Sequence, residues 1–425
     1  MGVINVEKSG RLEGVVQIGG SKNAVLPLLA STLLTDEPCV LGGVPALKDV
    51  DIMCRLLECF GAEVTEDRLA AQIRIHAKNI KTNIAPPDLV KAMRASIVAM
   101  GPLVARTGSV GVSLPGGCAI GERPIDLHIK GFRSLGAFVE CEESEDGGGF
   151  VKAEAGRLVG AEIYLDFASV GATENIMMAA VLADGTTIIE NPAQEPEIVD
   201  LANFLNKMGA KIRGAGTDVI RIEGVEKLHG AEHTVIPDRI EAATFMLAAA
   251  ITGSNILVDN MLPNHVVPVI AKLRETGVYV REAFGGIEVD ATRGMLKATD
   301  IKTLPYPGFP TDVQPQFMAF LTVVEGRSNI IETVFENRFM HIGELNKMNA
   351  GIVDNGRHAL VPGGASLKGA KVRATDLRAG AALILAGLAA EGLTTVSDIY
   401  HVDRGYEGLT EKLSKLGARI RRSES

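Results

Sequence analysis

An internal repeat constrains the fold of this chain more than any other feature of its sequence. A pattern typical of a helix end followed by a strand, Leu-x-x-x-Gly-Ala-x-Ile/Val, first occurs at residues 57–64. Related pairs follow at Gly136-Ala137, Gly209-Ala210, Gly277-Val278, Asn349-Ala350 and Gly417-Ala418. The spacings between successive copies are 75, 73, 68, 72 and 68 residues. Six units of about 70 residues therefore fill the chain.

Each repeat has a simple structural interpretation. Glycine, or asparagine in the fifth copy, ends a helix in the left-handed conformation. The alternating residues that follow, such as 210–213, predict a strand. Each copy also contains a second, alanine-rich helix, predicted at 23–34, 89–105, 172–183, 240–252, 313–324 and 377–390. The unit is thus predicted as strand, helix, strand, helix and two strands.

The alanine-rich helices indicate how these units pack. They are apolar on nearly every side, as in residues 379–390, and such helices are buried. The chain has 47 glycines, no tryptophan and 4% aromatic residues, so small aliphatic side chains must form its cores. We therefore predict an α/β fold, an inverse α/β barrel with helices inside and sheets outside. Two domains of three βαβαββ units are expected; a doubly wound sheet is the alternative, but it does not produce six repeats.

Charge restricts the partners of the chain. It has 43 Lys and Arg against 52 Asp and Glu, a net charge of −9, which argues against a nucleic-acid partner. A compact anion site built from a few cationic residues stays compatible with this charge. The longest apolar stretch, 379–390, is shorter than the roughly 20 residues that span a bilayer, so no membrane partner is expected.

The cysteines and the first residues bear on the compartment. The chain starts without the charged and apolar regions of a secretory signal. Its five cysteines are an odd number and include no Cys-x-x-Cys pair. This usage favours reduced thiols, and we expect a cytoplasmic protein.

Two loops suggest anion chemistry. Gly19-Gly20-Ser21-Lys22-Asn23 precedes an alanine-rich helix, which fits either an anion seat or a plain helix start. It lacks the spacing of a Walker loop. Residues 114–128 are rich in glycine and proline, as lid loops often are. Cys118 lies within this loop, and Arg123 nearby would favour its thiolate; an idle cysteine is the alternative.

A third stretch and several arginines complete the candidates. Asp312 ends Pro307-Gly308-Phe309-Pro310-Thr311-Asp312 at a helix entry, where it fits either a helix cap or a general base. Arginines at the edges of repeats are usually solvated. If they converged, each contact at ~4 Å would supply about 4 kcal/mol before desolvation. These arginines are Arg94, Arg338, Arg378 and Arg404.

Together these stretches resemble a known family along nearly the whole chain. The matching segments are 19–23, 115–118, 123–128, 169–173, 237–241, 309–312, 336–341 and 401–406. They resemble the UDP-N-acetylglucosamine 1-carboxyvinyltransferases, which are enolpyruvyl transferases of bacterial peptidoglycan synthesis. The resemblance implies transfer of enolpyruvyl from phosphoenolpyruvate to the 3'-hydroxyl of UDP-N-acetylglucosamine, with release of phosphate through a tetrahedral intermediate.

The resemblance also implies a domain arrangement. The first domain would run from residue 22 to 232 and carry the Cys118 loop. Residues 1–21 and 233–425 would form the second, with the active site in the cleft between them. No cofactor and no metal are implied, and a monomer is expected.

Residue roles follow from the same resemblance. Cys118 would protonate phosphoenolpyruvate, form a covalent adduct with it and react with fosfomycin, and Asp312 would take the proton of the sugar hydroxyl. Lys22, Arg123 and Arg404 would hold phosphate and carboxylate. The other substrate-binding residues implied are Asn23, Arg94, Pro124, Ile125, Asp126, Leu127, Ser169, Val170, Gly171, Val334, Arg338 and Arg378.

One position departs from the family, and three other functions compete. Phe167 stands where some members carry a lysine that reaches the nucleotide phosphates, so one diphosphate contact is in doubt. A 5-enolpyruvylshikimate-3-phosphate synthase would lack the loop with Cys118. A UDP-sugar sensor without catalysis would not need the full set of candidate residues. A cysteine hydrolase would need a Cys–His pair, for which His128 is the nearest candidate in sequence.

Overall fold

The computed structural model describes residues 2–114, 125–143 and 149–424 of the 425-residue chain. The described residues form two compact units. One comprises those within Gly20–Gly117 and Arg123–Ile236, and is called the middle unit here. The other comprises those within Met1–Gly19 and Pro237–Ser425, and is called the terminal unit.

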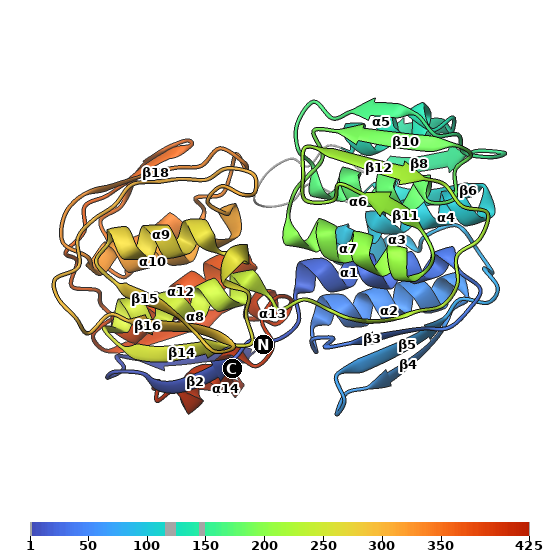
Figure 1. Cartoon of the computed structure of the whole chain (residues 1–425). Coiled ribbons are helices and arrows are strands. Elements are labelled where there is room, and N and C mark those ends of the chain that lie inside the picture. The colour runs from blue at the N-terminus through green and yellow to red at the C-terminus, as the bar shows by residue number, and fades with distance from the viewer. Residues whose placement is uncertain (1, 115–124, 144–148, 425) are drawn as a thin grey trace. The chain divides into compact units, whose positions relative to one another are not determined.

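The middle unit has three sheets, and its helices lie among them (Figure 1). Its sheets are ordered β13-β3-β5-β4, β6-β8-β7 and β11-β12-β10-β9. The strands are β3 (Cys39–Gly42), β4 (Glu63–Asp67), β5 (Gln72–His76), β6 (Ser109–Leu114), β7 (Phe138–Glu143), β8 (Gly149–Glu154), β9 (Glu162–Tyr164), β10 (Thr186–Glu190), β11 (Lys211–Arg213), β12 (Val219–Glu223) and β13 (Glu232–Thr234). The helices are α1 (Lys22–Ser31), η1 (Thr32–Leu34), α2 (Lys48–Phe60), α3 (Pro87–Ala92), η2 (Arg94–Ala99), α4 (Met100–Thr107), α5 (Asp126–Ser134), α6 (Val170–Ala180) and α7 (Pro196–Lys207).

The terminal unit repeats this plan, with sheets ordered β15-β16-β14-β2, β17-β18-β20-β19 and β21-β22-β1-β23. Its strands are β1 (Gly2–Glu7), β2 (Glu13–Gln17), β14 (Asn255–Asp259), β15 (Tyr279–Ala283), β16 (Gly286–Asp290), β17 (Ile301–Lys302), β18 (Ser328–Ile331), β19 (Val353–Asn355), β20 (His358–Val361), β21 (Lys371–Arg373), β22 (Leu393–Ser397) and β23 (Ile420–Glu424). The helices are α8 (Arg239–Thr252), η3 (Pro263–His265), α9 (Val267–Glu275), η4 (Thr311–Val313), α10 (Gln314–Val323), α11 (His341–Lys347), α12 (Leu377–Ala389), α13 (Tyr400–Asp403) and α14 (Leu409–Lys415).

Five of the six sheets in the described residues share one pairing pattern. In the sheet β6-β8-β7 the parallel first strand is reduced to a single bridge between Ile84 and Gly111. This recurrence confirms the predicted repeat. In the sheet of β9 to β12, the first strand pairs in parallel with the second, and the last two pair antiparallel. Two of the first strands pair with a strand that lies far away in the sequence. β2 pairs in parallel with β14, and β13 pairs in parallel with β3. β1 lies between β22 and β23 and completes the sixth repeat.

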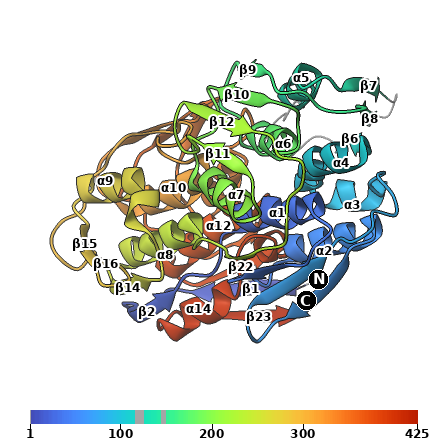
Figure 2. The same ribbon diagram turned by 45° about the vertical axis from the view of Figure 1, so that its right-hand side comes forward.

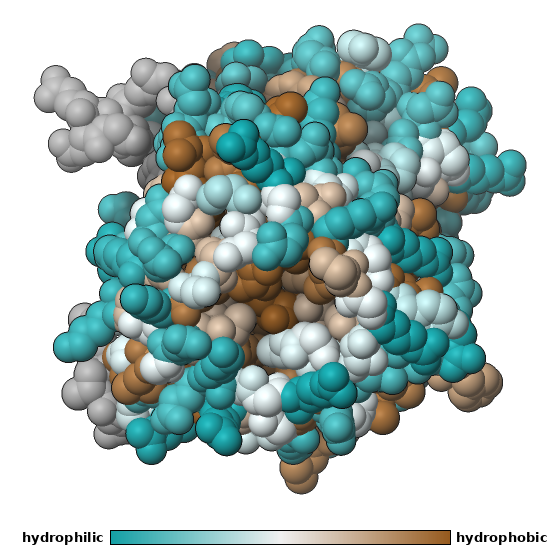
Figure 3. Space-filling view, turned by 90° about the vertical axis from the view of Figure 1, so that its left-hand side faces the viewer, coloured by the Kyte–Doolittle hydropathy of each residue, from teal (hydrophilic) through white to brown (hydrophobic). Residues whose placement is uncertain are grey.

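Helices lie inside and sheets outside in each unit, as predicted (Figures 1 and 2). In the terminal unit, the inner helices are α8, α10 and α12. Every residue of α12 from Arg378 to Leu388 is buried. The three helices pack against one another, and small alanines permit their close approach. The face of the molecule seen in Figure 3 carries hydrophilic side chains around a hydrophobic hollow.

The predicted inner helix at 89–105 is wrong in one respect, because it is broken. α3 ends at Ala92, Met93 is extended with φ −142° and ψ 107°, and η2 and α4 follow. The Ser96 hydroxyl donates to the Met93 carbonyl over 2.6 Å and so fixes the break. The break places Arg94 at the start of a short helical segment.

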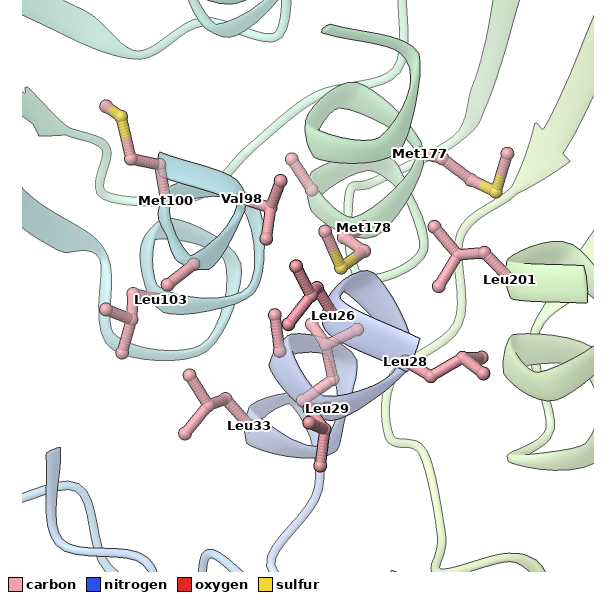
Figure 4. Close-up of a cluster of buried hydrophobic side chains, with 14 of the residues drawn as sticks. Leu26, Leu28, Leu29, Leu33, Val98, Met100, Leu103, Met177, Met178 and Leu201 are labelled. Carbon is pink, nitrogen blue, oxygen red and sulfur yellow. The ribbon is translucent and has the colours of Figure 1, made fainter. Parts of the chain in front are cut away.

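The inner helices of the middle unit enclose an aliphatic and methionine-rich core (Figure 4). Leu26 of α1, Val98 of η2 and Met178 of α6 gather at its centre, and each is almost wholly buried. Gly101 in α4 permits this packing, since a Cβ there would lie 2.4 Å from the Asn175 carbonyl oxygen. In neither unit is any helix of the described residues both long and apolar enough to cross a bilayer.

Candidate functional site

Lys22 is held at the start of α1 in the middle unit. Ser21 caps this helix, and its hydroxyl accepts from the Ala24 backbone N–H over 3.3 Å. The Lys22 ammonium lies 2.8 Å from an oxygen of Asp49, and the two side chains are 10% and 2% exposed. Asp49 lies in the first turn of α2, where a carboxylate is favoured by the helix dipole. Lys22 is therefore a cation of fixed position beside a helix N-terminus.

Gly20 is required by close packing next to this cation. A Cβ at Gly20 would lie 2.0 Å from the Gly43 carbonyl oxygen, so only glycine fits. Asn23 follows Lys22 in α1 and is half-buried. Gly20 thus determines the path of the backbone directly before Lys22.

The loop with Cys118 lies outside the described residues, as do Arg123 and Pro124. Ile125, the first described residue after this loop, directly precedes α5. Asp126 is the first residue of that helix, and Leu127 is buried.

His128 in α5 is a buried and neutral imidazole. Burial, with a smaller effect from the charge of Arg94, lowers the pKa of His128 to about 4. The Asn175 amide nitrogen lies 2.9 Å from His128 Nδ1 and 3.0 Å from the Ile97 carbonyl oxygen. Since a carbonyl only accepts, the amide nitrogen faces both groups and donates to Nδ1. The proton of His128 is therefore on Nε2.

Ser169, Val170 and Gly171 form the start of α6 next to His128. The Ser169 hydroxyl accepts from the Ala172 N–H over 3.4 Å and caps the helix. A Cβ at Gly171 would lie 3.2 Å from the His128 ring, so this helix end and α5 are adjacent. Half-buried backbone N–H groups at a helix N-terminus are suited to binding a phosphate.

Phe167, the residue that departs from the family, is 56% exposed. Its neighbour Asp166 pairs with Lys130 of α5 over 2.7 Å. A cation is therefore present beside this position, although it comes from helix α5 and not from residue 167.

The terminal unit holds a carboxylate between two arginines. Asp312 lies in η4, and its Oδ1 accepts from Arg338 over 3.1 Å. Its Oδ2 accepts from Arg378 over 3.2 Å. The arginine side chains are each 2% exposed, whereas that of Asp312 is 28% exposed. The guanidinium charges are thus offset by a carboxylate that still reaches the surface.

The segment before α12 sets the position of Arg378. Asp376 caps α12 by accepting from the backbone N–H groups of Arg378 and Ala379, over 2.8 and 3.1 Å. Burial would lower the pKa of the Arg378 guanidinium, but Tyr406 and Asp312 outweigh it and leave that pKa raised. Arg378 is therefore a permanent cation. Arg404 follows α13 and is half-buried.

Glu332 is an important residue that the sequence did not reveal. It is 1% exposed, and its Oε1 accepts from the Thr303 hydroxyl and the Val334 N–H over 2.9 and 2.8 Å. Its Oε2 accepts from the Thr311 hydroxyl over 3.0 Å. Hydrogen bonds to Glu332 therefore connect Val334 with Thr311, the residue before Asp312. A single glutamate after a short strand carries no signal of this role.

The structure thus brings Asp312, Arg338 and Arg378 together in the terminal unit. In the middle unit it gives Lys22 a buried partner, and it places the start of α6 beside His128. Among the described residues, no group of three or more His, Cys, Asp and Glu side chains is placed to hold a metal ion.

Comparison with known proteins gives one consistent result. Residues 6–413 match the model of the EPSP synthase (3-phosphoshikimate 1-carboxyvinyltransferase) family. UDP-N-acetylglucosamine 1-carboxyvinyltransferase 1 of Caldanaerobacter subterraneus subsp. tengcongensis is 60% identical over 417 residues, 98% of each chain. UDP-N-acetylglucosamine 1-carboxyvinyltransferase of Finegoldia magna is 57% identical over 428 residues, 100% of this chain and 99% of the relative.

Solved structures share the fold. The enolpyruvyl transferase NikO from Streptomyces tendae superposes with a TM-score of 0.88 at 26% identity, over 100% of this chain and 99% of the other. EPSP synthase from Acinetobacter baumannii gives a TM-score of 0.76 at 19% identity over 100% of both chains. The latter likeness concerns the fold alone.

Proposed function

We propose that this chain, which belongs to the UDP-N-acetylglucosamine 1-carboxyvinyltransferase family, transfers enolpyruvyl from phosphoenolpyruvate to the 3'-hydroxyl of UDP-N-acetylglucosamine. Phosphate is released in the same reaction, which opens peptidoglycan synthesis. The observation that carries the proposal is the carboxylate of Asp312, held between Arg338 and Arg378 in a chain that also presents Lys22 at a helix start.

The cations match the charge of phosphoenolpyruvate. This substrate carries close to three negative charges, and guanidinium and ammonium groups bind phosphate and carboxylate well. Lys22, Arg123 and Arg404 hold these groups, with Arg94 and Arg378 as further contacts. The buried ion pair with Asp49 supports this role of Lys22, because a cation that is already held in place loses little conformational entropy when it binds phosphoenolpyruvate.

Asp312 is the proton acceptor. The two arginines favour its charged form, so it is a carboxylate at neutral pH and can accept a proton. As the sugar 3'-oxygen attacks C2 of phosphoenolpyruvate, its proton passes to Asp312. The exposed part of the Asp312 side chain, 28%, leaves room for that hydroxyl.

Cys118 is the proton donor, a role that rests on the family resemblance. Its thiol adds a proton to the methylene C3 while the sugar oxygen bonds to C2, which gives a tetrahedral ketal that still carries phosphate. Loss of a proton from C3 and departure of phosphate then restore the double bond. This acid–base scheme needs no cofactor.

The nucleotide binds near the starts of α5 and α6. We assign uridine and diphosphate to Arg123, Pro124, Ile125, Asp126 and Leu127. Ser169, Val170 and Gly171 add the helix N-terminus, which suits a phosphate. The sugar is assigned to Asn23, Val334 and Arg338.

The two compact units provide the domains of this proposal. Their boundaries, at Gly19/Gly20 and Ile236/Pro237, lie within four residues of the proposed domain limits 22 and 232. We assign the enzyme to the cytoplasm because its substrates are phosphorylated metabolites, and we propose a monomer.

Phosphate release tests the function. The protein should release phosphate only when phosphoenolpyruvate and UDP-N-acetylglucosamine are both present, and not with shikimate 3-phosphate as acceptor. If phosphoenolpyruvate releases phosphate with shikimate 3-phosphate but not with UDP-N-acetylglucosamine, the chain is instead a 5-enolpyruvylshikimate-3-phosphate synthase. No release with either acceptor would refute enolpyruvyl transfer.

A further inference from the structure

Tyr406 lies in a buried polar cluster beneath Asp312 that the proposed chemistry does not use. It is 3% exposed. Its hydroxyl oxygen lies 3.0 Å from the Thr244 hydroxyl of α8 and 3.0 Å from the Gln316 amide nitrogen of α10. Gln316 is wholly buried, and its amide nitrogen also lies 3.0 Å from the Asp312 carbonyl oxygen.

The direction of these hydrogen bonds is determined by their ends. The Asp312 carbonyl can only accept, so Gln316 presents its amide nitrogen to it. The other hydrogen of that nitrogen is shared between the Tyr406 oxygen at 3.0 Å and the Thr244 hydroxyl oxygen at 3.2 Å. The Thr244 hydroxyl donates to the Ile240 carbonyl over 2.8 Å, so it accepts from Tyr406. Tyr406 therefore accepts from Gln316 and donates to Thr244, and both ends of the chain are anchored to backbone.

The ring of Tyr406 has a second contact. The Arg378 guanidinium carbon lies 5.2 Å from its centroid, within the range of a cation–π interaction. Nε and Nη1 of Arg378 are buried without a hydrogen-bond partner in the described part of the chain. The Tyr406 side chain is thus a direct neighbour of the guanidinium whose Nη2 donates to Asp312 Oδ2.

We propose that Tyr406 is a positioning residue for proton transfer at Asp312. It acts on the main chain of Asp312 through Gln316 and on its carboxylate through Arg378. This inference rests on the proposed function, in which Asp312 takes the proton of the sugar hydroxyl. A displacement of about 1 Å at a reacting group can cost about 100-fold in rate, so loss of this support should be measurable.

Two variants distinguish the effect of the Tyr406 hydroxyl from that of its ring. Tyr406→Phe keeps the ring under Arg378 and removes the hydroxyl, whereas Tyr406→Leu removes both supports. We expect kcat to fall by about 10-fold in the first and about 100-fold in the second. The KM for UDP-N-acetylglucosamine should stay within about twofold, because Tyr406 acts on the proton acceptor and not on nucleotide binding.

A matched control accounts for general damage to the core. Phe320→Leu removes an aromatic ring from the same core of the terminal unit, at a wholly buried residue that packs on Phe317. This variant should keep kcat within about threefold of wild type. Two variants of Thr244 test the same hydrogen bond without a change at Tyr406. Thr244→Ser keeps the hydroxyl that accepts from Tyr406 and should keep kcat. Thr244→Val removes that hydroxyl and should lower kcat.

The outcomes are distinct. Wild-type kcat in Tyr406→Leu, or an equal loss in Phe320→Leu, overturns the role of Tyr406. A rise in KM with unchanged kcat overturns it as well. If Tyr406→Leu does not fold, the Tyr406→Phe variant and the Thr244 pair decide the question by the same measurements. Absence of turnover in the wild-type protein would instead refute the proposed function itself.

Discussion

Lys22 and Asp49 form an ion pair of 2.8 Å that is almost wholly withdrawn from water. The attraction between the two charges offsets the free-energy cost of removing both from water. Removal of one partner leaves the other charge buried without this attraction. Asp49 thereby determines both the charge and the position of Lys22, the residue proposed to contact phosphoenolpyruvate.

Asp49→Asn should destabilise the middle unit by about 3 kcal/mol, because the buried Lys22 ammonium then loses the negative charge 2.8 Å away. Urea denaturation measures this loss. Glu154→Gln is the matched control, since the pair of Lys152 and Glu154 is also 2.8 Å but about half exposed. The control should cost less than about 1 kcal/mol. Equal losses in the two variants would contradict a special role for the buried pair.

Asp312→Asn should lower kcat by about 100-fold to 10,000-fold, the usual contribution of a positioned acid or base. Binding of UDP-N-acetylglucosamine, followed by calorimetry, should change little. The amide keeps the shape of Asp312 but cannot accept the sugar proton. Loss of binding with an unchanged kcat would contradict the role of Asp312 as the general base.

Fosfomycin should alkylate Cys118 alone. Burial raises the pKa of Cys54 to about 12 and raises that of Cys39, so neither buried thiol is a ready nucleophile. Peptide mapping of the treated protein should find the adduct at Cys118. Cys118→Ala should abolish both labelling and turnover, and Cys118→Asp should keep turnover while escaping the drug.

Cys59 and Cys141 are exposed and provide the controls for this experiment. Cys59→Ser and Cys141→Ser should leave labelling and turnover unchanged. An adduct on either of these residues would contradict the assignment of Cys118.

Acid should destabilise the protein partly through His128. Its pKa is about 4 in the folded protein, against about 6.5 in the unfolded chain, and burial is the main cause. Between pH 6.5 and 4, His128 binds a proton in the unfolded chain but not in the folded protein. Stability from this residue is therefore present above pH 6.5 and falls, by about 3 kcal/mol at most, as pH falls to 4.

His341 adds a similar effect, since burial lowers its pKa to about 4 as well. Melting temperatures measured across this pH range should fall less steeply in His128→Gln than in the wild-type protein. Parallel curves for the two proteins would contradict a neutral, buried His128.

The repeats explain why so much of the fold could be predicted. A marker such as Gly209-Ala210 occurs in every unit, so periodicity and glycine chemistry suffice to predict six βαβαββ units with inner helices. The break at Met93 was missed because apolar residues continue through it on both sides. The pairing of β2 with β14 and of β13 with β3 joins strands that are distant in sequence, which local pattern does not encode.

The site was predictable where its residues lie in distinctive motifs. Asp312, Arg338 and Arg378 were candidates from sequence, but their contact joins residues up to 66 positions apart, and only the fold reveals it. Asp49 and Glu332 had no signal, since an acidic residue at a helix start or strand end is common. Their importance follows from burial and from the atoms that they contact.

The central claim is that enolpyruvyl is transferred to the 3'-oxygen of the sugar. NMR of the sugar nucleotide formed from UDP-N-acetylglucosamine and phosphoenolpyruvate tests it most directly. We predict a vinyl ether in which the sugar proton H3' correlates over three bonds, through the ether oxygen, with C2 of the enolpyruvyl group, and phosphate formed in equal amount. An unchanged sugar nucleotide, or an enolpyruvyl group on any other oxygen, would contradict it.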